Sequence, residues 1–195
     1  MRWKASMRFI DALLGRVRPA ASKTEALFSI TTAYTTLETK LDIFHADVAG
    51  ICFKIIPSTT FERLRADLGE LLTLTKRETA TEYKMVKDSF GYLWIVLRDK
   101  DFEDIVTTMH LISNTLIENG FGESLLSSVF KFKKRDRVIY MIYNYKSGNF
   151  YPFIPMGDGR QRDEQYELKL GTLLRNELPV ERDIEKWYPM WDIPL

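Results

Sequence analysis

The sequence has little of what several protein classes require. It contains one cysteine, Cys52, among 195 residues, which excludes an internal disulfide framework and a cysteine-based zinc finger. Its 28 basic and 27 acidic residues nearly balance, so the chain lacks the strongly basic character of a nucleic-acid-binding domain. No apolar run approaches the roughly 20 residues that a membrane-spanning helix needs. With 45% apolar and 28% charged residues, the composition is typical of a folded globular protein.

Few residues are available for catalysis or metal binding. The only two histidines fall in different predicted elements: His45 is expected in a solvent-facing hairpin turn beside Asp47, and His110 as a structural or surface residue of a helix. Cys52 lies in an apolar strand, where a buried and inert thiol is expected. No Rossmann or P-loop motif and no Gly-x-Ser-x-Gly motif occurs. We therefore expect no enzyme, metal or cofactor, with an unrecognised active site as an alternative.

The first 18 residues predict a basic amphipathic helix that ends at Pro19. This segment carries a net charge of +4, whereas the remaining 177 residues carry −3. Such asymmetry suits a helix lying on an anionic membrane surface, while docking on the domain core or on a partner is the alternative. The residues expected to make the membrane or partner contact are Trp3, Met7, Ile10, Leu14, Arg2, Lys4, Arg8 and Arg16. The absence of a secretory signal pattern predicts a cytoplasmic protein, peripheral at the inner face of the membrane if this helix binds there.

Residues 20–195 are expected to form a single α+β domain that follows the N-terminal helix at residues 1–19. The predicted architecture is an antiparallel sheet built from hairpins, with helices packed on one face. Predicted strands are residues 33–43, 48–56, 82–87, 91–98, 125–132, 137–145 and 150–154, and predicted helices are 24–30, 60–75, 101–119 and 161–176. A capping box at Thr59 and Glu62 is expected to begin the second helix, and Gly120 to end the third.

Two parts of this pattern superpose at an offset of 41 residues. Gly50 falls on Gly91, and the Phe-Glu pair at residues 61–62 falls on the pair at 102–103 without a gap. The match indicates either duplication of a strand–strand–helix unit or chance similarity between two amphipathic units.

Aromatic side chains gather near the end of the predicted sheet. Six occur between residues 140 and 153, with basic residues close by. Cross-strand pairing in the core is one interpretation, an exposed protein-binding face is a second, and single-stranded nucleic acid a remote third. With the apolar end of the chain included, the candidate partner face consists of Tyr145, Phe150, Tyr151, Phe153, Trp187 and Trp191.

Several stretches together resemble one family, PspAB, which is associated with the phage-shock protein PspA. The segments that carry the resemblance, in the same order along the chain, are Phe9–Arg16, Gly91–Val96, Gly120–Val129, Tyr145–Phe153, Arg162–Leu168 and Trp187–Trp191. The family brings no established activity, cofactor or catalytic residue. The resemblance implies a non-enzymatic accessory or regulatory protein of a PspA-type envelope-stress response, with a PspA-like protein partner and an undefined oligomeric state. A chaperone-like protein that binds apolar peptides is the alternative within the binding class.

Overall fold

The structure is a computed structural model that describes residues 24–157 and 160–195. The predicted amphipathic helix at residues 1–18, with its eight candidate contact residues, lies outside the described residues. Within the described ranges, no helix has the length and apolar character needed to cross a bilayer.

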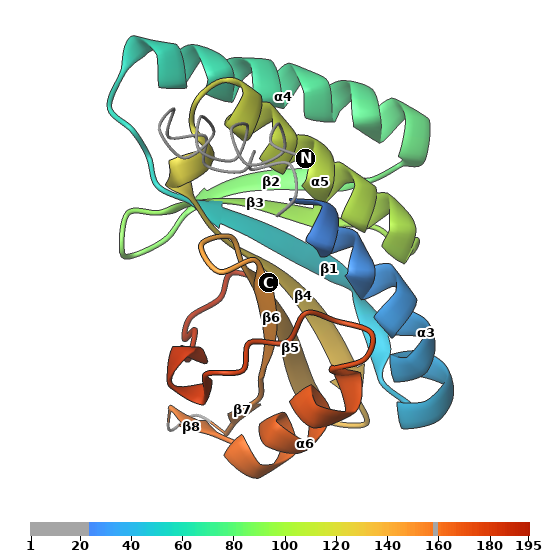
Figure 1. The fold of residues 1–195 in the computed structure, drawn as a ribbon. Coiled ribbons are helices and arrows are strands. Elements are labelled where there is room, and N and C mark those ends of the chain that lie inside the picture. The colour runs from blue at the N-terminus through green and yellow to red at the C-terminus, as the bar shows by residue number, and fades with distance from the viewer. Residues whose placement is uncertain (1–23, 158–159) are drawn as a thin grey trace, which may run out of the picture.

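The described chain alternates helices with antiparallel strands, as the patterns predict (Figure 1). Six strands form one sheet in the order β2-β3-β1-β4-β5-β6, and two short strands, β7 and β8, form a separate pair. The helices are η1 (Ala26–Phe28), α3 (Ser29–Leu41), α4 (Thr59–Thr79), α5 (Phe102–Glu118), η2 (Gly122–Ser124), α6 (Glu164–Leu174) and η3 (Ile184–Lys186). The strands are β1 (Phe44–Phe53), β2 (Glu82–Lys87), β3 (Leu93–Arg98), β4 (Leu125–Lys134), β5 (Arg137–Asn144), β6 (Asn149–Phe153), β7 (Pro155–Met156) and β8 (Gln161–Arg162). The predicted α+β class with an antiparallel sheet is confirmed.

Three helices cover one face of the sheet, which we call the helix face. Helix α5 contacts β1 and β4 and packs against both α4 and α3, an arrangement visible in Figure 1. Aromatic rings join the layers: Phe61 of α4 lies 6.3 Å from Phe53 of β1, and Phe102 of α5 lies 5.8 Å from Phe130 of β4, between ring centroids. These fully or nearly fully buried rings form the main core, where each large apolar side chain contributes about 1.5–3 kcal/mol by leaving water.

Part of the opposite face, the back face, is covered by the end of the C-terminal segment, which comprises residues 177–195. A side chain at Gly50 of β1 would meet Leu195 at 2.9 Å and Trp94 at 3.1 Å. Further along, the Ser127 hydroxyl donates to the Met190 sulfur at 3.8 Å. The apolar end of the chain therefore docks on the sheet, as its composition predicts.

Helix boundaries follow from local capping. Helix α5 begins at the predicted Asp101, whose carboxylate accepts the Glu103 amide at 2.9 Å, and the chain leaves it through Gly120 at φ +82°. Helix α4 differs from the prediction, because Ser58 rather than Thr59 caps it, accepting the Phe61 amide at 3.1 Å. The prediction of a capping box was thus wrong by one residue.

The prediction of a strand at residues 33–43 was wrong, because this segment lies in α3. Its threonines and loose alternation favour a strand, but Ile30, Ala33 and Leu37 are buried at helical spacing against the core. The first unit of the suggested duplication therefore lacks a hairpin. At the 41-residue offset the helices α4 and α5 superpose, whereas β1 falls on a stretch that includes the β2–β3 turn.

Candidate functional site

The C-terminal segment begins by covering the edge of the sheet at β6. The Phe150 amide donates to the Pro179 carbonyl at 2.8 Å, and the Glu181 amide donates to the Phe150 carbonyl at 2.8 Å. These bonds form a parallel bridge between Phe150 and Val180. The outward-facing amide and carbonyl of Phe150 on this edge strand are thereby satisfied within the chain.

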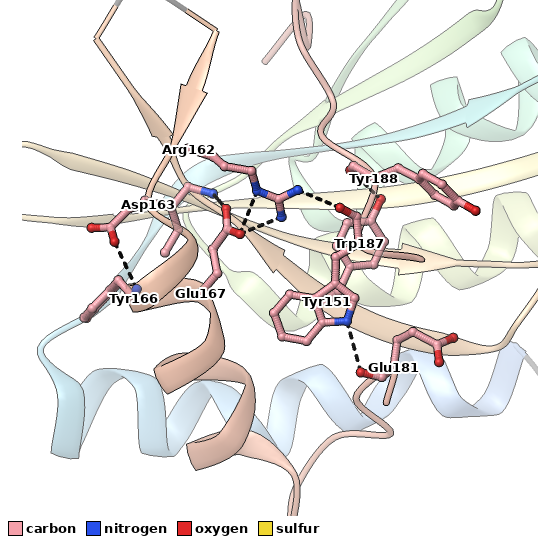
Figure 2. Close-up of polar contacts among 9 residues, drawn as sticks. Tyr151, Arg162, Asp163, Tyr166, Glu167, Glu181, Trp187 and Tyr188 are labelled. Atoms are coloured by element: carbon pink, nitrogen blue, oxygen red, sulfur yellow. Dashed lines mark hydrogen bonds and ion pairs between the residues drawn. The ribbon is translucent and has the colours of Figure 1, made fainter. Parts of the chain in front are cut away.

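A buried ion pair lies where the segment leaves this edge (Figure 2). Arg162 of β8 donates to Glu167 of α6 through Nε at 2.8 Å, and their side chains are 15% and 2% exposed. Glu167 also accepts the Ile154 amide at 2.7 Å. Burial raises the pKa of Glu167, and the hydrogen bonds from Arg162 and Ile154 oppose this effect. The pair thus satisfies both charges inside the fold.

The same arginine holds the C-terminal segment in place. Its Nη1 donates to the Trp187 carbonyl at 2.6 Å, while the Tyr151 hydroxyl donates to the Tyr188 carbonyl at 3.1 Å. The Trp187 indole donates to the Glu181 carbonyl at 3.0 Å, and its ring is stacked against Tyr151 at 6.4 Å between centroids. We call Tyr151, Arg162, Glu167 and Trp187 the docking cluster. Its contacts connect α6, β6, β8 and the C-terminal segment (Figure 2).

Close packing in this cluster predicts opposite effects at two helical glycines. A Cβ at Gly171 would lie 2.6 Å from the Trp187 ring, whereas a Cβ at Gly69 of α4 would meet nothing within 4 Å. Alanine favours a helix over glycine, but at residue 171 the clash with Trp187 outweighs this preference. We therefore expect Gly171→Ala to lower the free energy of unfolding by about 1–2 kcal/mol, and Gly69→Ala to raise it by about 0.5–1 kcal/mol. Urea unfolding of both variants measures the difference. Equal stabilisation by both would contradict the packing of Trp187 on α6.

The candidate partner-face residues mostly lie inside the fold. Five of them are buried, and Trp191 is partly buried against the core. Phe150 pairs with Tyr143, Phe153 contacts Trp191 edge-to-face at 5.0 Å, and the Tyr145 hydroxyl bonds to Ser128 at 2.8 Å. Cross-strand core pairing therefore describes these side chains in the structure. A partner would reach Tyr151 and Phe153 only after the C-terminal segment moved away. The five buried candidates are Tyr145, Phe150, Tyr151, Phe153 and Trp187.

The prediction of a solvent-facing His45 was wrong. Its side chain is 2% exposed and lies against the rings of Tyr34, Phe102 and Phe132. An irregular register between β1 and β4 turns this residue inward, with Asp47 at φ +56°. Nδ1 accepts the Asp47 amide at 3.2 Å, and the buried Nε2 has no hydrogen-bond partner in the described structure. Burial lowers the pKa of His45 to about 4.

The other two reactive side chains are placed as predicted. Cys52 is buried, and burial raises the pKa of its thiol to about 12, so it stays protonated and unreactive at neutral pH. His110 is partly buried against Phe28, with ring centroids 4.4 Å apart, and burial lowers its pKa. Both residues therefore act as packing groups in the folded chain.

The surface hollows on the described residues include three of several hundred Å³. Their volumes are about 450, 310 and 350 Å³, and none of the three is lined by His45, His110 or Cys52. The largest lies between α4 and β2, the second beside the C-terminal segment near Val180, and the third on the back face near Pro194. Across residues 24–157 and 160–195, no three histidine, cysteine or acidic side chains gather where they could hold a metal ion.

Comparison with known families identifies the chain. The family model PspAB, described as PspA associated protein B, matches residues 7–195. The chain belongs to the PspAB family. A search of curated proteins and a search of solved structures each found no match.

Three of the segments that carried the PspAB resemblance lie at structurally demanding positions in the described chain. Residues 145–153 form the β5–β6 turn and β6, where the Asn144 carboxamide accepts the Lys146 amide at 2.9 Å and Gly148 has φ +75°. Arg162 and Glu167 belong to the segment that precedes and begins α6, and Trp187 to the segment that docks beside it. In this PspAB chain, much of the resemblance thus falls on the docking of the C-terminal segment.

Proposed function

We propose that this PspAB chain is a non-enzymatic accessory protein of a PspA-type envelope-stress response and acts by contact with a PspA-like protein. The observation that carries the proposal is the family match over residues 7–195, because the family is described by its association with PspA. The regulatory role rests on the resemblance to this family, and the peripheral position at the membrane rests on the charge of residues 1–18.

The charge distribution supports the membrane part of the proposal. Residues 1–18 hold five basic residues against one acidic residue, while the rest of the chain has a slight acidic excess. A basic side chain near an anionic surface contributes about 1 kcal/mol to binding, an effect that salt screens. A reversible, salt-sensitive anchor would place the chain beside membrane-bound partners without inserting it into the bilayer.

The membrane contact is tested by co-sedimentation of the full chain with vesicles. We expect binding to vesicles of mixed phosphatidylglycerol and phosphatidylcholine at low salt, and none to phosphatidylcholine alone. Neutralising Arg2, Lys4, Arg8 and Arg16 to glutamine should weaken binding by more than roughly tenfold. The matched control neutralises four exposed basic residues elsewhere: Arg63, Lys100, Lys169 and Arg175. Equal loss in both variants would contradict a specific anchor.

The protein contact is tested separately, with purified PspA and the full chain in solution. Isothermal titration calorimetry without lipid should detect a complex, because the proposal places the contact between the two proteins. The absence of heat exchange, together with vesicle binding, would contradict the partner and leave only the membrane contact. Unchanged binding of PspA by the variant with Arg2, Lys4, Arg8 and Arg16 neutralised would show that the contact does not depend on these four charges.

A further inference from the structure

Four basic side chains lie on the back face of the sheet, on three of its strands. We call Lys84 of β2, Arg98 of β3, and Lys131 and Lys133 of β4 the basic strip. The register places Val96 and Val129 directly opposite Gly50, which faces the C-terminal segment. Alternate residues of a strand share a face, so these four side chains lie on that same face. Lys84 is opposite Val96 in the β2–β3 pair.

Within the described residues, the four cations of the strip share their face with the carboxylate of Glu82, which lies opposite Arg98. None of the four residues takes part in an ion pair within the described ranges. Glu82 instead pairs with Lys76 of α4 at 3.3 Å. Like charges on neighbouring positions of one sheet face repel, so this arrangement costs stability in the free protein.

The electrostatic environment of Lys131 reflects this repulsion. Burial lowers the pKa of Lys131, and the charges of Lys133 and Arg98 lower it further. Its ammonium donates to the Leu195 main-chain oxygen at 2.8 Å and lies 6.0 Å from the centre of the Tyr140 ring. The ammonium is therefore held at the border between the C-terminal segment and the open part of the back face.

Apolar surface adjoins these charges. Phe44, which lies opposite Lys133, is 50% exposed. On the neighbouring strands β3 and β2, a hollow of about 350 Å³ is lined by apolar side chains, by Lys84 and Arg98 of the strip, and by Glu82. The apolar residues of its lining are Val86, Val96 and Pro194. A surface that combines a hollow for a side chain with several cations fits an irregular polypeptide better than a flat bilayer.

We propose that the basic strip binds an acidic segment of a protein partner, with carboxylates on the four cations and an apolar side chain in the hollow beside Pro194. The proposal deepens the proposed function by giving its protein contact a location and a charge. Complementary charge would speed association and define the orientation of the partner, and salt would weaken the complex.

The test measures binding of a fluorescein-labelled 12-residue peptide of alternating glutamate and leucine by fluorescence anisotropy. The full chain is compared with Arg98→Glu/Lys133→Glu and with the control Lys169→Glu/Arg175→Glu, which changes net charge equally at exposed positions of α6 and the residue after it. Both variants retain residues 1–18, so their difference reports on the strip alone. Circular dichroism and urea unfolding verify that each variant is folded.

We expect the strip variant to bind the peptide on the order of tenfold more weakly and the control to change less than about twofold. A peptide with glutamine in place of glutamate should bind the full chain, the strip variant and the control variant with the same affinity. Equal weakening in both variants would overturn the proposal. It would also be overturned if the strip variant lost binding to phosphatidylglycerol vesicles but kept binding to the peptide.

The outcome is separable from that of the proposed function. If the wild-type chain binds PspA and the strip variant still binds the acidic peptide normally, the strip assignment fails while the accessory role stands. If the wild-type chain binds the peptide through the strip but does not bind PspA, the strip stands and its partner is another acidic protein.

Discussion

Replacing Glu167 with alanine is expected to lower the free energy of unfolding by about 3–5 kcal/mol, because it leaves the Arg162 guanidinium buried without a counter-charge. The carboxylate is 2% exposed and accepts hydrogen bonds from Arg162 at 2.8 Å and from the Ile154 amide at 2.7 Å. Arg162 in turn holds the Trp187 carbonyl. Urea unfolding followed by tryptophan fluorescence measures the loss.

Two further variants separate the charge from the packing. Replacing both partners, as Arg162→Met/Glu167→Leu, should cost much less than Glu167→Ala, because no buried charge then remains unpaired. Lys169→Ala, at an exposed position of the same helix, should change stability by no more than about 0.5 kcal/mol. If Glu167→Ala lowered the free energy of unfolding no more than Lys169→Ala does, the ion pair would be solvated and would not hold the C-terminal segment.

The sequence predicts most of the elements of this fold because their signals are local. The short apolar and β-branched runs of the strands and the capping residue Asp101 depend on neighbours a few positions away. Helix α3 was missed because its threonines favour extended backbone, while burial of Leu27, Ile30 and Leu37 favours the helix. That burial depends on elements later in the chain, which a local pattern does not contain.

The docking cluster was less predictable than the strands that surround it. The aromatic composition of the last residues indicated docking, and the helical periodicity after Gln161 indicated α6. Asp163, whose carboxylate accepts the Tyr166 amide at 3.0 Å, is a recognisable helix cap. Nothing in the spacing shows that Arg162 points inward, because its partners include the Trp187 carbonyl, 25 residues away. Long-range pairing of this kind follows from tertiary structure alone.

The grouping of side chains on the back face likewise follows from tertiary structure and not from sequence spacing. Basic residues are adjacent in the sequence around the β4–β5 turn, where lysine commonly protects an exposed strand from pairing with another chain. The sheet order separates them: Lys131 and Lys133 share a face with Arg98, whereas Lys134 donates to the Leu41 carbonyl on the helix face. Residues adjacent in sequence thus serve opposite faces, and residues 33 positions apart share one face on either side of β1.

Acidification is expected to destabilise the folded chain through His45. Its pKa is about 4 in the folded state, because burial among Tyr34, Phe102 and Phe132 disfavours the charged ring, against 6.5 when exposed. Asp47 and Asp99 raise the pKa but do not offset the burial.

The direction of the effect follows from which state binds the proton first. The unfolded chain takes it up as the pH falls below 6.5, whereas the folded chain resists until about pH 4. The stability contributed by neutral His45 is therefore complete above pH 6.5, falls by about 3 kcal/mol between pH 6.5 and 4, and is constant below. Urea unfolding at a series of pH values measures this slope.

His45→Phe should remove that slope, because phenylalanine keeps a planar ring among the same neighbours and binds no proton. It also removes the Nε2 atom that has no hydrogen-bond partner in the described structure, so this variant should be at least as stable as wild type at pH 5. His110→Gln should retain most of the dependence, because its ring is less buried than that of His45. An unchanged slope in His45→Phe, or a slope lost only in His110→Gln, would show that the irregular β1–β4 register does not enclose His45 as the structure describes.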